Sequence, residues 1–91
     1  MTKAEFTEHV ARKAGLAKAD AAKAVDAMLQ TVEETLARGS DVTFSGFGKF
    51  HVTQRAARQG VHPRTGERIT IAASRAPRFT PGSGLRRSVA G

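Results

Sequence analysis

The stretch GVHPRTGER, residues 60–68, predicts the tip of a β-ribbon that stands out from the rest of the chain. Pro63-Arg64-Thr65-Gly66 supplies residue types that form tight turns. On the return limb, Ile69 and Ile71 alternate with polar residues, as they do in a strand. The outgoing limb has no apolar face that could join a core. We therefore expect residues 54–74 to form an arm that is apolar at its base and basic along its length.

The chain has little material for a hydrophobic core. It has 91 residues, and its only aromatic residues are five phenylalanines. If the arm stands free, a body of about 70 residues remains, and a body of this size usually needs additional stabilisation. The absence of cysteine excludes a disulfide or a thiolate metal site. We therefore expect an obligate dimer. Because no stretch resembles a signal peptide or a membrane span, we also expect a soluble cytoplasmic protein.

The positive charge is concentrated in the second half of the chain. The net charge is +7 and the pI is about 11.2. Residues 1–52 carry seven basic and seven acidic side chains, whereas residues 53–91 carry eight arginines and one acid, Glu67. Arginine pairs with phosphate oxygens through a planar fork and is weakly hydrated. This distribution favours a nucleic-acid partner over a merely solvated basic surface.

Two helices are expected before the sheet. Thr2 and Glu5 have the spacing of a capping box, and Gly15 is a natural helix end. The apolar residues between Ala21 and Leu36 then repeat at helical spacing, and Gly39 ends the second helix. The pattern predicts a helical hairpin. A helix-turn-helix reader is disfavoured because the second helix lacks a polar recognition face.

The periodicity changes to that of strands after Gly39. Val42 and Phe44 alternate with polar residues, residues 45–48 form a turn, and Phe50 and Val52 resume the alternation. After the arm, a further strand is expected to end near Phe79.

Two irregularities are expected in these strands. Arg55 and Arg58 have opposite parity, and a bulge at Ala56-Ala57 would bring them onto one side of the ribbon. Pro77 is expected to interrupt the strand that follows the arm.

Five short motifs occur in a fixed order along the chain. Together they resemble the bacterial histone-like HU family, of which integration host factor is a sister branch, and the match covers about residues 2–89. The motifs are KAGLAKADAAKAVDAML (13–29), GFGKF (46–50), RAARQG (55–60), HPRTGE (62–67) and ASRAPRFTPG (73–82).

The resemblance implies an α+β fold in an intertwined homodimer with an α-helical base. Each subunit would contribute a three-stranded antiparallel sheet and a protruding β-ribbon arm. The implied function is that of a nucleoid-associated architectural protein that bends and compacts double-stranded DNA through the minor groove, with little sequence specificity. The single domain, residues 1–91, would comprise a helical hairpin (1–39), a saddle sheet (40–53 and 75–82), the arm (54–74) and a C-terminal helix (83–91).

The resemblance also assigns roles to individual residues. Pro63 would act as an intercalating wedge, and HU proteins are themselves standard examples of minor-groove wedging. The expected DNA-binding residues are Lys3, Lys18, Arg55, Arg58, His62, Pro63, Arg64, Thr65, Arg68, Arg75, Arg78 and Arg86. The expected core or dimer-interface residues are Val25, Met28, Leu29, Val32, Leu36, Phe44, Phe47, Phe50 and Phe79.

The chain departs from the family pattern in a few places. The arm tip reads Val61-His62-Pro63, where the family usually has Arg-Asn-Pro. We expect phosphates beside His62 to favour its protonation, so that DNA binding tightens modestly as the pH falls. The usual serine N-cap of the second helix is replaced by Ala17, at a cost of about 1 kcal/mol. His51 is interpreted as structural.

Other function classes fit the sequence less well. No catalytic set, cofactor motif or metal-ligand spacing is recognisable, so an enzyme is disfavoured. A basic RNA-binding protein remains an alternative, although such proteins usually carry aromatic residues for stacking, and here the phenylalanines have core-like spacing. An integration host factor-like subunit with site preference is the other alternative.

Overall fold

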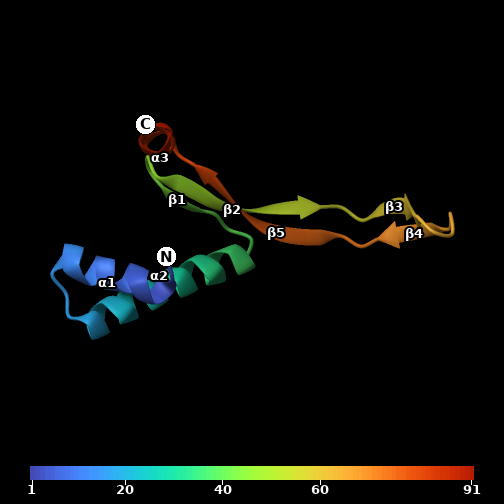
Figure 1. Ribbon diagram of the computed structural model, residues 1–91. Coiled ribbons are helices and arrows are strands. Elements are labelled where there is room, and N and C mark those ends of the chain that lie inside the picture. The colour runs from blue at the N-terminus through green and yellow to red at the C-terminus, as the bar shows by residue number, and fades with distance from the viewer. The chain divides into compact units, whose positions relative to one another are not determined.

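The structure is a computed structural model that describes the whole chain, Met1 to Gly91. It contains two compact units, residues 1–35 and residues 36–91. No helix has both the length and the apolar composition that a membrane crossing requires. In chain order the elements are α1 (Lys3–Ala14), α2 (Lys18–Ala37), β1 (Val42–Phe44), β2 (Gly48–Arg55), β3 (Arg58–Val61), β4 (Arg68–Ile71), β5 (Ser74–Pro81) and α3 (Ser83–Ala90) (Figure 1).

The first unit is the predicted helical hairpin. The Oγ1 atom of Thr2 accepts a hydrogen bond from the backbone N–H of Glu5 at 3.2 Å, which confirms the predicted cap of α1. Gly15 ends α1 with a left-handed φ of +68°. The carbonyl of Ala17 accepts the first bond of α2, from Ala21, so the N-cap position of this helix carries no side-chain acceptor.

The interior of the helical hairpin is small. Its buried side chains are those of Thr7, Ala11, Ala21 and Val25. No large side chain is fully buried anywhere in the chain. A single copy therefore buries little apolar surface, and the stability that such burial provides is correspondingly limited.

The second unit contains a three-stranded antiparallel sheet with the strand order β1-β2-β5. The β2–β5 ladder runs without a break from Gly48 opposite Pro81 to Arg55 opposite Ser74. The predicted interruption at Pro77 is therefore wrong, because Pro77 pairs with Val52 inside this ladder. The proline is tolerated because β5 is an edge strand, where one side of the backbone makes no ladder bonds.

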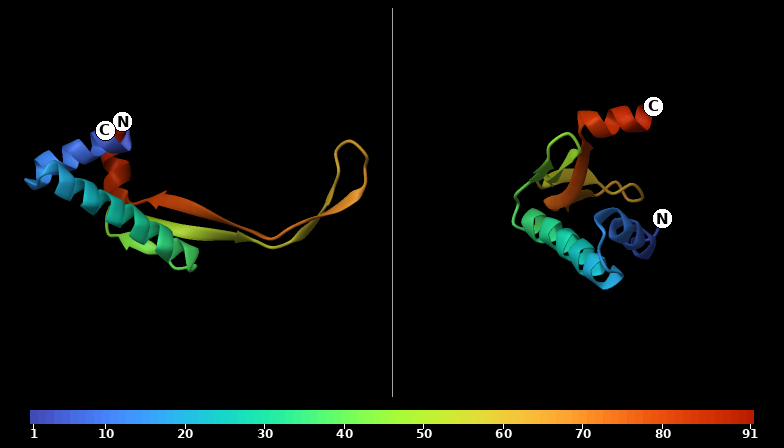
Figure 2. Two further views of the ribbon diagram at one scale, coloured as in Figure 1. Left: turned by 90° about the horizontal axis from the view of Figure 1, so that it is seen from below. Right: turned by 90° about the vertical axis from the view of Figure 1, so that its left-hand side faces the viewer.

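The arm continues the β2–β5 pairing through β3 and β4 (Figure 1). Arg55 lies opposite Ser74 and Arg58 lies opposite Ile71, so each limb has two residues between these pairs. A bulge needs one extra residue on one limb, so the predicted bulge at Ala56-Ala57 is wrong. Instead, both limbs leave the ladder together, and the ribbon bends along its length (Figure 2).

The C-terminal helix α3 starts against the turn between β1 and β2. The backbone N–H of Gly82 donates to Phe47 O at 2.7 Å, and that of Leu85 donates to Gly46 O at 3.2 Å. A Cβ atom added at Gly82 or Gly84 would lie 2.8 Å from the backbone of Gly46. Glycine is needed at both positions because the two backbones approach so closely.

These elements confirm the predicted α+β class, with a helical N-terminal part, an antiparallel sheet and an extended β-arm.

Candidate nucleic-acid interface

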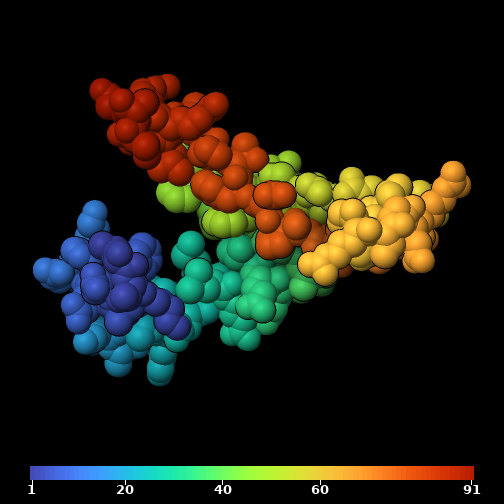
Figure 3. All heavy atoms as spheres, turned by 45° about the vertical axis from the view of Figure 1, so that its right-hand side comes forward, coloured from blue at the N-terminus to red at the C-terminus, as the bar shows by residue number.

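The arm carries four arginines that have no acidic partner. Arg55 ends β2, Arg58 begins β3, Arg64 lies in the tip and Arg68 begins β4. All four side chains are exposed, and the ion pairs of the chain all involve lysine. The far end of the arm, yellow and orange in Figure 3, has no other segment of its unit packed against it. These charges are therefore available to an external polyanion.

The two faces of the arm differ in polarity. Gln59 lies opposite Thr70, and their side chains approach to 3.4 Å on one face. On the other face, Ile69 lies opposite Gly60 and Ile71 lies opposite Arg58. A Cβ added at Gly60 would lie 2.9 Å from Cδ1 of Ile71. Arg55 belongs to the β2–β5 ladder and Arg58 to the β3–β4 ladder, with two unpaired residues on each limb between them.

The tip is an ordered turn that presents Pro63. The backbone N–H of His62 donates to Glu67 O at 2.7 Å, and that of Gly66 donates to His62 O at 2.9 Å. Nδ1 of His62 accepts from the backbone N–H of Arg64 at 3.2 Å. The hydroxyl of Thr65 accepts from the N–H of Glu67 at 3.3 Å. Pro63 itself is exposed at the end of this turn.

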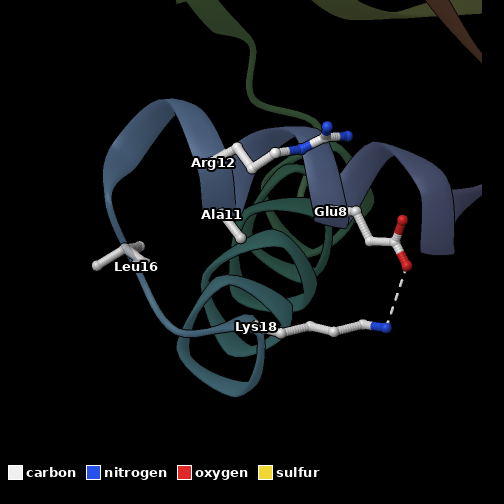
Figure 4. Close-up of a pocket in the computed structure, with 5 residues that line it drawn as sticks. All are labelled: Glu8, Ala11, Arg12, Leu16 and Lys18. Carbon is white, nitrogen blue, oxygen red and sulfur yellow. Dashed lines mark hydrogen bonds and ion pairs between the residues drawn. The ribbon is translucent and has the colours of Figure 1, made fainter.

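The two lysines expected at the interface already have carboxylate partners. Lys3 pairs with Asp26 at 3.0 Å. Lys18 pairs with Glu8 at 3.1 Å beside a shallow hollow in the helical hairpin (Figure 4). Both pairs are largely exposed, and exposed pairs are weak enough for a phosphate to compete with them.

Arg75 has a partner within its own chain. Its Nη2 atom lies 3.3 Å from the carbonyl oxygens of both Leu36 and Ala37, at the C-terminal end of α2. The last carbonyls of a helix lack N–H donors from a following turn, and the helix dipole favours a cation there. The carbonyl of Leu36 also accepts from the backbone N–H of Gly39 at 2.9 Å. Within the second unit, the contact links β5 to Leu36 and Ala37, so the contact of Arg75 with phosphate stays a prediction.

Arg78 lies on the polar face of the sheet. It pairs in register with His51, whose Nε2 lies 2.9 Å from Oγ1 of Thr80. Lys49, two residues before His51, has the same strand parity and pairs with Asp41 at 3.2 Å. Neither Lys49 nor His51 was predicted to belong to the site. Alternation within β2 is a sequence signal that groups Lys49 with His51, whereas their place beside Arg78 depends on the register.

The last of the expected DNA-binding residues lies in the C-terminal helix. Arg86 is exposed in α3, beside an apolar hollow formed with Pro81, Leu85 and Val89.

The opposite face of the sheet is apolar and only partly covered. Phe50 and Phe79 face each other across β2 and β5 with ring centroids 4.7 Å apart. Phe44 lies 6.3 Å from Phe50, and Phe47 lies 5.8 Å from Phe79. Phe47 remains 49% exposed, so the four rings form an aromatic cluster open to solvent.

The helical residues expected at the core or interface show the same exposure. Val25 is buried, whereas Met28 and Leu29 are 48% and 50% exposed. Val32 and Leu36 are half-buried.

No group of three or more histidine, cysteine or acidic side chains is arranged to hold a metal ion.

Comparison with known proteins identifies close relatives over the full length of the chain. The family profile described as "Bacterial DNA-binding protein" matches residues 1–90. The DNA-binding protein HU of Geobacillus stearothermophilus is 47% identical over 89 residues, which is 98% of this chain and 99% of the relative. The DNA-binding protein HU 1 of Bacillus subtilis is 45% identical over 91 residues, 100% of this chain and 99% of the relative.

Solved structures show the same arrangement of elements. The Anabaena HU–DNA cocrystal structure superposes with a TM-score of 0.85 at 40% identity, covering 99% of this chain and 98% of that chain. HU from Thermotoga maritima gives a TM-score of 0.68 at 31% identity, covering 98% of each chain.

Proposed function

We propose, because this chain belongs to the HU family of bacterial DNA-binding proteins, that two copies of it bend double-stranded DNA with their arms. The chain is an HU-type architectural DNA-binding protein, and proteins of this family are not enzymes. The observation that carries the proposal is the arm itself, a two-limbed ribbon with arginines that lack acidic partners and an exposed proline at its tip.

The proposed active form is a homodimer in which each chain forms a single domain. The open aromatic cluster and the exposed helical residues Met28 and Leu29 give each copy apolar surface that it cannot bury alone. A second copy of the same chain carries the same apolar surface, and the two surfaces could pack against each other across a two-fold axis. Dimer formation would supply the buried area that a body of this size lacks.

The proposed mechanism is minor-groove wedging. Pro63 has no N–H, so its ring can enter between two base pairs without burying an unsatisfied donor. Unstacking one step costs a few kcal/mol, which contacts between the arginines and phosphates along the bent duplex offset. In the proposal, Arg55, Arg58, Arg64 and Arg68 follow the groove, while Arg78, Arg86, Lys3 and Lys18 contact flanking phosphates.

Weak sequence preference follows from this chemistry. The minor groove distinguishes little beyond A·T from G·C, and the arm has no paired asparagine or glutamine readers. Bent, nicked or flexible duplexes should be preferred because they cost less to deform. A protein with these properties would compact DNA in the bacterial nucleoid, which is where we propose that it acts.

Bending can be measured with a nicked duplex that carries a donor and an acceptor fluorophore at its two ends. We expect energy transfer to rise when the full-length protein binds, and to rise much less with Pro63→Ala. Pro77→Ala is the matched control, because this proline lies in the sheet and not at the tip. Equal energy transfer for Pro63→Ala and the unmodified protein would refute the wedge. Stronger binding to structured RNA than to the duplex would favour the RNA-binding alternative.

A further inference from the structure

We propose that His62 is a positioning residue for the wedge: its ring holds the turn that presents Pro63, and protonation of the ring releases this turn. The inference rests on the proposed function of Pro63 and concerns how that function is regulated. It does not depend on any direct contact between His62 and DNA.

The hydrogen bond of the His62 ring spans the proline. Nδ1 of His62 accepts from the backbone N–H of Arg64, two residues on, at 3.2 Å. This is the geometry by which asparagine and aspartate side chains stabilise turns. Because Pro63 lies between the donor and the acceptor, the bond restricts the backbone on both sides of the proline.

The backbone of His62 makes two further hydrogen bonds within the tip. Its backbone N–H donates to Glu67 O at 2.7 Å, and its carbonyl accepts from the N–H of Gly66 at 2.9 Å. The ring therefore adds a third bond to a residue that already closes the turn through its backbone. Removing the ring would leave the Arg64 N–H to water, while the two backbone bonds remain possible.

The ring bond requires neutral histidine. Nδ1 can accept only through its lone pair, so the proton of the neutral ring must sit on Nε2. An imidazolium ion is a donor at both nitrogens and cannot accept from Arg64. The bond is therefore present while the ring is neutral, and it is lost when the ring is protonated.

The charged groups near His62 do not provide the same switch. Arg64 and Glu67 lie in the tip, and Arg58 and Arg68 lie in the flanking strands. Arginine stays protonated throughout, and a carboxylate titrates well below imidazole. At the tip, the His62 ring is thus the group whose protonation removes a hydrogen-bond acceptor from the turn.

This geometry changes the pH dependence expected from sequence. The sequence suggested only that a protonated His62 would attract phosphate and tighten binding. Protonation also breaks the hydrogen bond that holds the turn, which should reduce bending. Affinity and bending should therefore respond differently to pH. At low pH the protein should bind DNA at least as tightly as at high pH, while bending it less.

The test measures affinity by fluorescence anisotropy and bending by energy transfer, at about pH 5 and about pH 8. The loss of one turn hydrogen bond should reduce the population of the ordered tip by about fivefold. For the unmodified protein we expect reduced bending at low pH without reduced affinity. His62→Asn should bend DNA equally at both pH values, because its carboxamide oxygen can accept the same bond and does not titrate. His62→Ala should bend poorly at both.

The variants distinguish failure of this inference from failure of the wedge. His9 and His51 are present in every variant, so any effect of these two residues is common to all of them. If Pro63→Ala bends DNA fully, the wedge itself is wrong. If Pro63→Ala loses bending but His62→Asn keeps the pH dependence of the unmodified protein, only the role of His62 is refuted. The role of His62 is likewise refuted if His62→Ala bends DNA normally at about pH 8.

Discussion

Arg55 and Arg75 have the same side chain but different surroundings. Arg55 ends β2 at the base of the arm and has no acidic partner. Arg75 donates to the last carbonyls of α2, at Leu36 and Ala37. Their charge is equal, so composition alone could not separate a residue available for DNA from one engaged within the chain.

Alanine substitution should therefore affect these two arginines differently. Arg55→Ala should make the plot of log affinity against log salt shallower by about 2 for a dimer, which is about 0.9 for each arm, and leave stability unchanged. Arg75→Ala should lower the free energy of unfolding by about 1 kcal/mol and leave the salt slope nearly unchanged. Salt titration of DNA binding and urea denaturation measure the two effects. Equal changes in salt slope for both variants would contradict the assignment.

A second residue-scale prediction concerns the start of α2. Ala17 accepts the first bond of the helix but offers no side-chain oxygen to the free N–H groups of the first turn. Ala17→Ser should raise the free energy of unfolding by about 1 kcal/mol, as measured by urea denaturation. Ala24→Ser, at an exposed position inside the same helix, is the control and should lower it slightly.

At the scale of elements, features that depend on residues close in sequence could be predicted, whereas features that depend on strand pairing could not. The cap at Thr2, the helix end at Gly15 and the turn chemistry of the tip depend on residues close in sequence, and each could be predicted. The tolerance of Pro77 depends on β5 being an edge strand, and the missing bulge depends on how two distant limbs align. Such features arise from contacts between remote residues, which periodicity does not encode.

The candidate site divides in the same way. The exposed arginines of the arm and the position of Pro63 follow from composition and turn residues. The ring bond of His62 and the helix contact of Arg75 depend on side-chain geometry. Sequence identified both residues as members of the site but could not reveal either contact.

The packing of Gly48 gives an element-scale prediction. A Cβ at this position would overlap the ring of Phe79 and lie 2.9 Å from the carbonyl oxygen of Thr80. Gly48→Ala should therefore cost about 1–3 kcal/mol of stability, because the β2–β5 ladder must shift to accommodate it. Thr43→Ala, at an exposed position of β1, should cost only a few tenths of a kcal/mol. Thermal unfolding compares them, and equal melting temperatures would contradict the packing argument.

At the scale of the whole molecule, stability and assembly should be inseparable. The melting temperature should rise with protein concentration, because the folded copy depends on its partner. If a dimer neutralises roughly 6–10 phosphates, log affinity against log salt should have a slope of about −5 to −9. A nearly flat response would remove the electrostatic basis of binding.

Phe47 tests the proposed dimer interface. It is 49% exposed in the single copy and belongs to the aromatic cluster. Phe47→Ala should weaken dimerisation by at least tenfold, because a buried aromatic anchor is worth about 2 kcal/mol at an interface. Val61→Ala is the control, since Val61 is 64% exposed at the tip of the arm. Sedimentation equilibrium measures both, and identical dissociation constants would place the interface elsewhere.

The matched limbs of the arm restrict how its length can change over evolutionary time. From Arg55 opposite Ser74 to Val61 opposite Arg68, neither limb gains a residue on the other. An insertion in one limb alone would turn every later side chain of that limb to the other side and misalign the proline with its groove. Insertions and deletions should therefore be retained only when both limbs change by the same number of residues. The length of the arm in related proteins should then differ by equal additions to the two limbs.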